Sequence, residues 1–305
     1  MCLPVTRQLW DLRDRPGTIE AVGGKALGLA ALEAAGLPVP PAQVVPSSVY
    51  RRHVETAPSI QAAIDDLGTT TSELADLRHD IEGIDLNEVA RSEIMESASS
   101  LRAPLAVRSS AAVEDSPSAS WAGQFKTLLG VNHSAIPRSI ARCWASLFTP
   151  EVAAYAANLK SSLRHGAMAV VIQELVRPVW AGVTFVGVRT SPELPPEDTV
   201  LVEAVRGMGE HLVSGASNPE VRIIANIATG KVVTRVVNLN PRRGCRVTAG
   251  RELPASVVDD LVVGLSQLRT IYGHERLDVE WGWDGTKVWF LQVRAIAFRD
   301  SGSFA

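Results

Sequence analysis

The sequence predicts an α+β protein with a helix-rich first lobe and a sheet-rich second lobe. Apolar residues recur at helical spacing through much of the first half, whereas valine-rich runs bounded by Gly and Pro recur in the second. The hydrophobic fraction of 46% and the charged fraction of 21% are close to globular averages, so extensive disorder is excluded. With 305 residues the chain has the length of two ordinary domains, and we place their boundary between residues 165 and 166.

The first lobe, residues 1–165, opens with a predicted helix over residues 24–35. Gly36 should end this helix, because glycine adopts the left-handed conformation that closes helices. Prolines at positions 38, 40 and 41 then exclude helix and lead into a strand. The elements predicted after them are a strand at 43–45, two or three helices within 58–101, a strand at 105–108, a strand at 125–131 and helices within 134–164.

The second lobe, residues 166–305, is predicted to be mostly sheet. Its valine-rich runs have the length and composition of buried strands. A hairpin is expected around Asp284-Gly285, a common turn pair. The predicted strands are 167–176, 182–188, 200–204, 220–225, 231–238, 277–283 and 287–296, with one amphipathic helix at 253–272.

Charge and composition exclude several classes of function. A net charge of −3 argues against a broad nucleic-acid or membrane surface. No apolar run approaches the length of about 20 residues that a membrane-spanning helix needs, and the N-terminus lacks a secretory pattern. Cys2, Cys143 and Cys245 lie far apart, which favours reduced thiols over disulfides or zinc. We therefore expect a cytoplasmic protein with no nucleic-acid or membrane partner.

The first candidate site is Gly23-Gly24-Lys25 at the predicted start of a helix. Glycines let the backbone approach an anion closely, and a lysine there adds its charge to the positive end of the helix dipole. The Walker phosphate-binding pattern is absent. On its own, this tripeptide also fits an ordinary junction between a turn and a helix.

The second candidate is Arg108-Ser109-Ser110, at the expected end of a strand. A guanidinium group bonds two phosphate oxygens at once, and flanking serines add hydroxyl groups. A loop of small and polar residues follows as far as Gly123, and it could close over a ligand. A solvated connecting loop is the alternative interpretation.

The third candidate is the strand end from Gln173 through Glu174 to Val176. Exposed backbone beside apolar residues can pair with the edge of an adenine ring. Recognition of that kind uses main-chain groups, so the sequence carries little signal for it, and a plain core strand is the alternative.

The fourth candidate lies on the predicted C-terminal hairpin. Strand alternation puts Asp278 and Glu280 on one face, and likewise Gln292 and Arg294. Oxygen ligands of this kind suit Mg²⁺, and the arginine could neutralise phosphate charge. All four share a face only with an odd-length hairpin loop, because a two-residue turn puts Glu280 and Gln292 on opposite faces. A solvent-facing hairpin with a salt bridge is the alternative.

These motifs occur in the order found in one family. The chain resembles the N-terminal ATP-binding domain of phosphoenolpyruvate synthase and pyruvate phosphate dikinase, which is also the ATP-binding part of rifampin phosphotransferase. The resemblance runs from about residue 8 to residue 297. The matching stretches are 23–29, 36–40, 107–110 with 114–115, 122–124, 171–173, 181–183, 203–210, 213–215, 278–281 and 291–294.

The resemblance implies an ATP-grasp-like fold whose two lobes enclose ATP and Mg²⁺. It implies that Lys25, Arg108 and Arg294 act on the phosphates, with Gly24, Ser109 and Gly123 beside them in the phosphate grip and lid. It implies further that Gln173, Glu174 and Val176 line the adenine, that Glu203 lies beside the nucleoside, and that Asp278, Glu280 and Gln292 surround the metal.

The leading functional hypothesis is a stand-alone kinase that transfers a phosphoryl group from Mg-ATP to a hydroxyl of a small metabolite, such as an antibiotic or natural-product intermediate. The family's Thr-x-Gly-Gly-x-Thr-x-His carrier motif is absent from the sequence. Trp121 and Trp180 are candidates to line the acceptor pocket. Two alternatives stay open. One is the nucleotide-binding subunit of a split system, which phosphorylates a histidine on a separate carrier protein. The other is a non-catalytic ATP-binding module.

Overall fold

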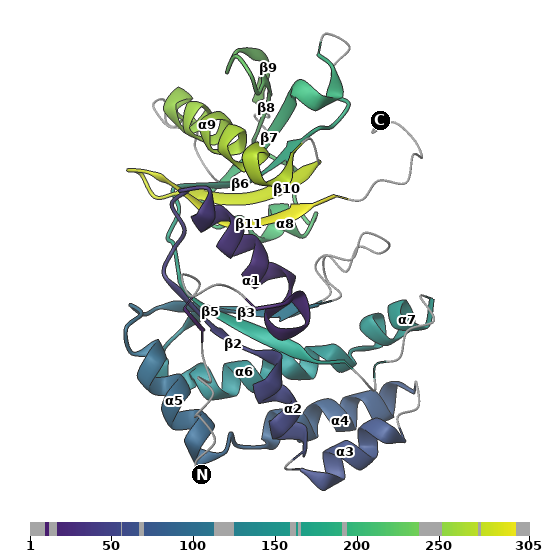
Figure 1. The fold of residues 1–305 in the computed structure, drawn as a ribbon. Coiled ribbons are helices and arrows are strands. Elements are labelled where there is room, and N and C mark those ends of the chain that lie inside the picture. Colours follow the sequence, from purple (N-terminus) through teal and green to yellow (C-terminus); the bar gives the residue numbers. More distant parts are fainter. Residues whose placement is uncertain are drawn as a thin grey trace, which may run out of the picture. The chain divides into compact units, whose positions relative to one another are not determined.

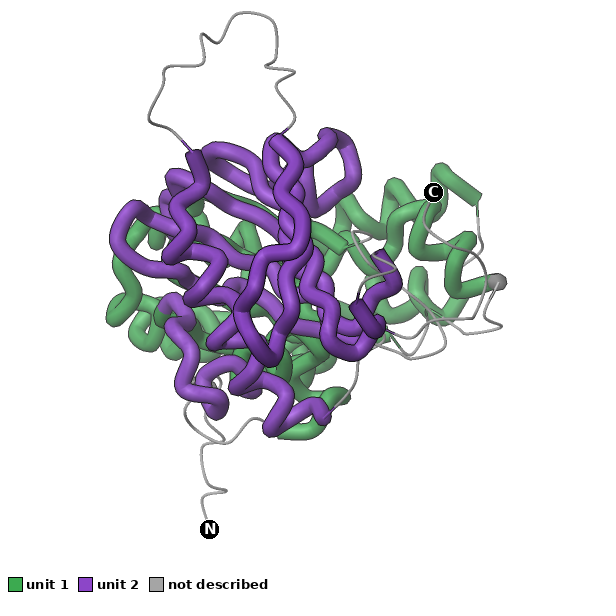
Figure 2. The backbone as a smooth tube through the Cα atoms, turned by 90° about the horizontal axis from the view of Figure 1, so that it is seen from above, with its two compact units in different colours: residues 1–30, 41–175 green, residues 31–40, 176–305 purple. Residues whose placement is uncertain are grey.

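The structure is a computed structural model that describes residues 10–11, 17–55, 57–66, 70–112, 125–158, 163, 166–190, 194–237, 252–273 and 276–296. The chain divides into two compact units, which Figure 2 shows in separate colours. Unit 1 contains residues 1–30 and 41–175, and unit 2 contains residues 31–40 and 176–305. Each unit is built around one antiparallel sheet.

Unit 1 has a five-stranded sheet of order β1-β2-β5-β3-β4. Helices cover the sheet (Figure 1). The strands are β1 (Trp10–Asp11), β2 (Ala42–Val45), β3 (Leu105–Ala111), β4 (Thr127–Val131) and β5 (Met168–Glu174). The helices are α1 (Ile19–Ala34, of which unit 1 holds the part up to Ala30), α2 (Ser47–Glu55), α3 (Pro58–Asp65), α4 (Thr71–Gly83), α5 (Glu88–Ala98), α6 (Ile136–Ala145) and α7 (Pro150–Asn158).

Side chains of β3 and β5 point alternately to the two faces of the unit 1 sheet. Val107 and Ile172 are opposite one another, and both belong to the hydrophobic core that α2 to α7 form with one sheet face. Residues of the other parity, such as Arg108 opposite Val171, lie on the second face. The N-terminal part of α1 lies on that second face (Figure 1). Arg108, Ser110 and Gln173 therefore lie on the face of the sheet that α1 covers.

Local sequence signals fix where several helices begin and end. Thr70 and Glu73 form a reciprocal capping box at the start of α4, and the Asn87 side chain accepts from the Ala90 amide at the start of α5. The expected stop at Gly36 is confirmed. Its φ is 75°, and its amide donates to the Glu33 carbonyl while the Leu37 amide donates to that of Leu32.

Unit 2 has a six-stranded sheet of order β11-β10-β6-β7-β8-β9. Every strand that the second half of the sequence predicts is present, with ends shifted by a few residues. The elements are β6 (Trp180–Val186), β7 (Thr199–Arg206), α8 (Glu210–Val213), β8 (Val221–Asn226), β9 (Val232–Val237), α9 (Ala255–Tyr272), β10 (Leu277–Trp283) and β11 (Val288–Ala295).

Helix α9 covers one face of this sheet and closes the core of unit 2. Gly264 on the helix lies so near the Phe290 ring that a Cβ atom there would approach it to 2.5 Å. On the same sheet face, the indole of Trp281 is buried and donates a 2.9 Å hydrogen bond to Thr184. This packing leaves the opposite sheet face for the polar residues of β7, β10 and β11.

The division of the chain differs from the expected boundary at residues 165 and 166. β5 pairs with β2 and β3, so it is a strand of the first sheet, and the change of unit falls after Leu175. Residues 31–40 also join unit 2, where the Phe290 amide donates to the Pro38 carbonyl. Strand pairing over long sequence separations decides both points, and such pairing leaves no mark in local composition.

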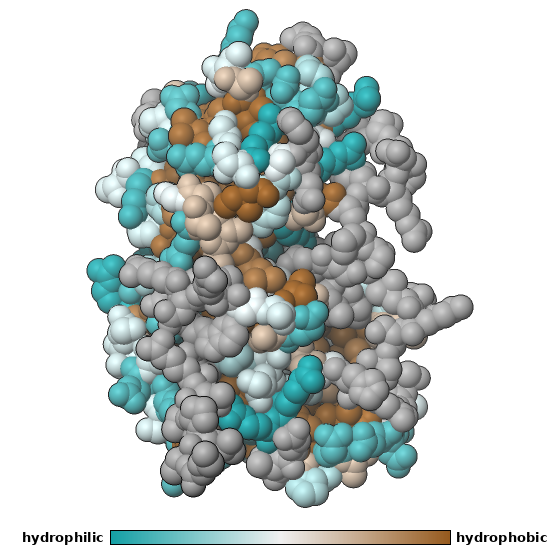
Figure 3. All heavy atoms as spheres, in the orientation of Figure 1, coloured by the Kyte–Doolittle hydropathy of each residue, from teal (hydrophilic) through white to brown (hydrophobic). Residues whose placement is uncertain are grey.

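The visible surface mixes hydrophilic and hydrophobic side chains. Figure 3 shows teal and brown residues interleaved over the coloured part of this face. The large apolar side chains that are exposed include Val89, Val263 and Ile271. No helix in the part of the chain that the structure describes combines the length and apolar character needed to cross a membrane.

Candidate nucleotide site

Arg108 and Gln173 are brought together on the second face of the unit 1 sheet. Arg108 on β3 is 8% exposed and Gln173 on β5 is 2% exposed. The Arg108 Nη1 donates to Gln173 Oε1 at 3.5 Å. A buried guanidinium needs anionic or polar partners, because burial without them is costly. Arg108 is therefore suited to receive phosphate oxygens on this face.

Ser109 lies elsewhere than the resemblance implies. The sequence predicts that the strand ends at Arg108, but β3 continues to Ala111, so Ser109 and Ser110 are both strand residues. Alternation turns Ser109 toward the core beside Val107, away from Arg108. Its Oγ is buried and has no hydrogen-bond partner among the residues that the structure describes. We therefore remove Ser109 from the phosphate site, and the hydroxyl on the face of Arg108 is that of Ser110.

Lys25 follows a break in helix α1. Gly23 has φ 75° and ψ 169°, so the helix is interrupted there and restarts with Gly24 and Lys25. This break coincides with the helix start that the sequence predicts. Lys25 is 7% exposed, and such burial of an ammonium group favours a nearby anion. The positive end of the restarted helical segment adds to the attraction.

The predicted adenine segment has most of its polar groups already engaged. The Glu174 carboxylate accepts from the Arg102 amide at 2.9 Å and forms an ion pair with the Arg102 side chain at 3.3 Å. The Glu174 and Leu175 amides donate to the carbonyls of Pro41 and Pro104. Adenine recognition here would therefore use the main chain near Val176 rather than the Glu174 side chain.

In unit 2, the predicted metal and nucleoside residues form one row across the sheet. Gln292 is opposite Glu280, which is opposite Val183, which is in turn opposite Glu203. Residues directly opposite in antiparallel strands share a face. The adjacent row on the same face contains Arg294 opposite Asp278. Side chains from β7, β10 and β11 thus lie on one surface.

A β-bulge produces this alignment, which corrects the expectation of an odd hairpin loop. Trp283 is opposite Val288, so the connection holds four residues, 284–287, an even number. The register then shifts between Glu280 and Trp281, and Leu291 is the extra residue. Without it, Gln292 would face the α9 side of the sheet. Glu280 and Gln292 can share a face only if an odd number of residues is inserted. The single extra residue lies within the strand and not in the turn.

Asp278 has one oxygen engaged and one without a partner. The Arg294 guanidinium donates to Asp278 Oδ2 through Nε and Nη2, whereas Oδ1 is buried and has no hydrogen-bond partner within the described part of the chain. Burial raises the pKa of Asp278, Arg294 opposes that shift and Glu280 adds to it. A second positive charge at this carboxylate would relieve both the burial and the repulsion.

Glu203 is held by a residue that the sequence argument did not identify. Arg222 on β8 donates to Glu203 Oε1 from Nε at 2.9 Å and from Nη2 at 2.6 Å. The two residues are opposite each other in the β7–β8 register. This pairing fixes the carboxylate of the predicted nucleoside contact. Only strand register could have revealed Arg222.

The donor set fits a magnesium ion by its chemistry. Asp278, Glu280 and Gln292 supply two carboxylates and an amide oxygen, and Mg²⁺ prefers such hard ligands while keeping waters or phosphates as the others. The partnerless Oδ1 of Asp278 is the atom that best marks the position. Among the residues that the structure describes, no group of three or more His, Cys, Asp or Glu side chains is arranged to hold a metal.

Two further predictions have different outcomes. Gly123 and Trp121, with the rest of the expected lid, lie outside the described residues. Trp180 is 3% exposed on the sheet face opposite to Glu280, where the Arg206 guanidinium lies 5.3 Å from its ring centroid. We therefore remove Trp180 from the candidates for an acceptor pocket, because it is a core residue of unit 2.

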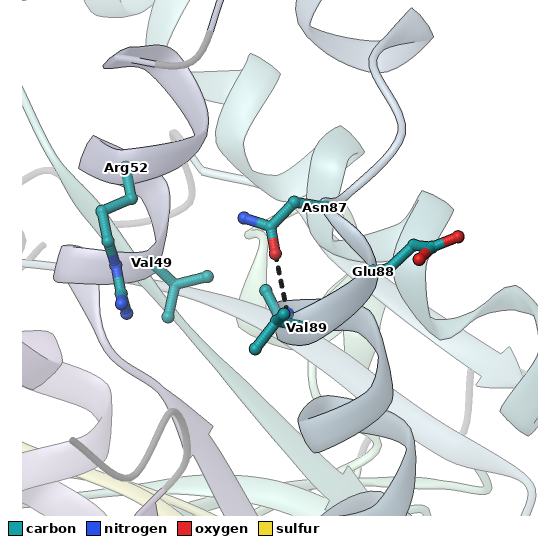
Figure 4. A pocket seen from close by; sticks show the side chains of 6 residues that line it. Val49, Arg52, Asn87, Glu88 and Val89 are labelled. Atoms are coloured by element: carbon teal, nitrogen blue, oxygen red, sulfur yellow. Dashed lines mark hydrogen bonds between the residues drawn. The ribbon is translucent and has the colours of Figure 1, made fainter. Parts of the chain in front are cut away.

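A separate pocket of about 350 Å³ lies in unit 1 between α2 and α5 (Figure 4). The residues that the sequence predicts for the nucleotide do not line it. Its lining is Val49, Arg52, Asn87, Glu88, Val89 and Ala90.

The class of protein is given by a family model for an AMP/ATP-binding domain. The chain belongs to the family described as pyruvate phosphate dikinase, AMP/ATP-binding domain, whose model matches residues 19–303. This confirms the resemblance stated from the motifs. The two sheets with their covering helices confirm the α+β fold class.

Two similar proteins show how the chain compares with longer relatives. It is 35% identical over 263 residues to a rifampicin phosphotransferase of Streptomyces sviceus, which covers 81% of this chain and 30% of that protein. It is 29% identical over 314 residues to a probable phosphoenolpyruvate synthase of Methanocaldococcus jannaschii, covering 93% of this chain and 26% of the other. The chain thus spans about a third or less of these relatives.

Among solved structures, the D-alanine–D-alanine ligase of Helicobacter pylori is similar with a TM-score of 0.34 and 8% identity. The match covers 75% of this chain and 54% of the ligase.

Proposed function

We propose that this protein is an ATP-dependent phosphotransferase that moves a phosphoryl group from Mg-ATP directly to a hydroxyl of a small metabolite. Membership of an AMP/ATP-binding domain family supports the nucleotide. The rifampicin phosphotransferase relatives, whose name indicates a small-molecule acceptor, support the acceptor class. Natural products with free hydroxyl groups are the acceptors that we would test first, and the cytoplasm, where ATP is supplied, is the proposed location.

The single observation that carries the proposal is the polar face of the unit 2 sheet. The bulge at Leu291 aligns Asp278, Glu280 and Gln292 there, with Arg294 beside Asp278. A core-packing role does not explain four polar side chains on one face of this hairpin, two of which, Asp278 and Gln292, are buried. Phosphoryl transfer needs this combination of oxygen ligands and a cation.

Each residue has a defined task in the proposed reaction. Lys25, Arg108 and Arg294 would bind and orient the phosphates, with Gly24 allowing close approach of the backbone. Asp278, Glu280 and Gln292 would hold Mg²⁺, which when bound neutralises phosphate charge. Glu203 would position the nucleoside, and the main chain near Val176 the adenine. Positioning and charge neutralisation account for most catalysis of this type.

The proposal is tested by product analysis with the purified chain alone. We expect ADP and a phosphorylated acceptor when Mg-ATP and a panel of hydroxylated metabolites are supplied, and no product with Glu280→Gln. Mass spectrometry identifies both products. Acceptor phosphorylation that needs a second protein would contradict direct transfer, and calorimetry that detects no Mg-ATP binding would contradict any ATP-dependent role.

A carrier-dependent reaction is the second candidate, because the relatives extend far beyond the part that this chain matches. In that case a histidine on a separate protein would receive the phosphoryl group. The products distinguish the two reactions. Direct transfer releases ADP, whereas the carrier route releases AMP and phosphate and leaves acid-labile phosphate on the partner.

A further inference from the structure

Helix α1 is interrupted at the residue that precedes the two predicted phosphate contacts, Gly24 and Lys25. Gly23 departs from helical geometry, with φ 75° and ψ 169°, although residues on both sides are helical. A break inside a helix has a specific cause, such as a side chain inserted into the hydrogen-bond ladder. The structure shows such an insertion.

The inserted group is the hydroxyl of Ser110. Ser110 Oγ donates to the Val22 carbonyl at 2.7 Å and accepts from the Ala26 amide at 3.2 Å. In an uninterrupted α-helix, the amide of residue 26 would donate directly to the carbonyl of residue 22. The hydroxyl therefore takes the place of one helical hydrogen bond and satisfies both of its ends.

The contact between α1 and β3 leaves no space for a side chain. A Cβ atom at Gly23 would lie 2.1 Å from the Ser110 carbonyl oxygen and 2.5 Å from its Oγ. Ser110 itself is completely buried. Helix α1 and strand β3 are therefore in close contact at one point, where Gly23 packs against the Ser110 backbone and hydroxyl.

This point lies between the two predicted phosphate-binding cations of unit 1. Lys25 is within the turn that Ser110 bridges, from Val22 to Ala26. Arg108 is two residues before Ser110 on the same strand, so both lie on the same face of the sheet. The hydrogen bond joins positions 84 residues apart in the sequence, and it ties the helix that carries Lys25 to the strand that carries Arg108.

We propose that Ser110 is a positioning residue for the phosphates of the nucleotide. Its hydroxyl holds α1 open at Gly23, so that Gly24 and Lys25 stand at a fixed distance from Arg108, while Ser110 itself does not touch the ligand. This inference rests on the proposed function, because it assumes that Lys25 and Arg108 bind the same phosphate chain.

Neighbouring serines provide a matched pair of variants in the full chain. Ser110→Ala removes the bridging hydroxyl, whereas Ser109→Ala removes an equally buried hydroxyl that has no hydrogen-bond partner and faces the core. Calorimetry would measure the affinity of each variant for Mg-ATP and for adenosine. We expect Ser110→Ala to weaken Mg-ATP binding about tenfold, since interactions with a charged ligand are lost.

Adenosine has no phosphates, so its affinity should be the same in both variants and in the wild-type protein. A purely structural role for Ser110 would lower both affinities together, and this outcome would overturn the proposal. Equal effects of the two substitutions on Mg-ATP would overturn it as well, as would wild-type Mg-ATP affinity in Ser110→Ala.

A measurement without nucleotide separates this inference from the proposed function. Hydrogen exchange of peptides covering residues 22–26 should be faster in Ser110→Ala than in Ser109→Ala, because the Ala26 amide loses its acceptor. Unchanged exchange would contradict the bridging role. A wild-type chain that binds neither ligand would instead contradict the proposed function, and the exchange comparison would still decide whether the hydroxyl holds the turn.

Discussion

Ser109 and Ser110 are adjacent, identical and completely buried, yet they have opposite surroundings. One faces the core without a hydrogen-bond partner, and the other bridges two groups of α1. At the residue scale, the chemistry of a side chain is set by the face on which it lies. The same principle separates Trp180, a core residue, from Glu280 on the other side of the same sheet.

Asp284 supports a prediction at this scale. Its Oδ1 accepts from the amides of Thr286 and Lys287, and its Oδ2 accepts from the Trp289 indole at 2.7 Å. Burial acts to raise the pKa of Asp284, but the hydrogen bonds from Thr286 and Trp289 outweigh it and hold the pKa well below its usual range. The carboxylate therefore stabilises the hairpin turn while it is ionised.

Asp284→Asn keeps an acceptor for the turn amides and loses the acceptor for Trp289. We expect it to lower the free energy of unfolding by about 1 kcal/mol at pH 7. Because the folded-state pKa is depressed, the stabilisation is fully present above the unfolded pKa of about 4 and is lost progressively as the pH falls from there through the folded-state pKa. Urea unfolding at pH 7 and pH 3 should show that the difference in free energy of unfolding between the wild-type protein and Asp284→Asn is smaller at pH 3. A difference in free energy of unfolding that does not change with pH would contradict stabilisation by the ionised Asp284 carboxylate.

At the element scale, irregularities place the functional side chains. The break at Gly23 begins the helical segment that carries Lys25, and the bulge at Leu291 turns Gln292 toward Glu280. Both elements were predicted from periodicity, since residues 24–35 and 277–296 have clear patterns. The faces on which individual side chains lie were not predicted. One inserted residue moves every side chain beyond it to the other face.

Gly23 and Gly36 have the same φ of 75°. Replacing each by alanine therefore distinguishes the cost of the left-handed backbone from the cost of a steric clash. Gly36→Ala should cost about 1 kcal/mol, because its Cβ meets open space and only the left-handed conformation is penalised. Gly23→Ala should cost clearly more, because its Cβ would also collide with Ser110. Chemical unfolding of both variants gives the comparison. Equal losses would show that the contact between α1 and β3 relaxes at little cost.

At the scale of the whole molecule, the proposed residues are divided between two units. Lys25 and Arg108 belong to unit 1, whereas Asp278, Glu280 and Arg294 belong to unit 2. Each unit places its own set on one sheet face. The contribution of each set to nucleotide binding can be measured separately.

We expect Mg-ATP to raise the melting temperature of the wild-type protein, since a ligand at 100 times its Kd stabilises by about 2.7 kcal/mol. Lys25→Met in unit 1 and Glu280→Gln in unit 2 should each reduce that shift, and so should removal of Mg²⁺ with a chelator. Thermal unfolding measures all three. A shift that one of these substitutions leaves unchanged would contradict the role proposed for that residue.

The sequence by itself determined the α+β class, the order of nearly every strand and helix, and the family, because periodicity, glycine placement and ordered motifs are local properties. It also identified the residue types suited to phosphate and metal. Only the tertiary structure decided that β5 belongs to the first sheet, that Ser110 and not Ser109 accompanies Arg108, and that Arg222 fixes Glu203. These facts depend on strand register and on contacts between residues far apart in the chain, and no local pattern records them.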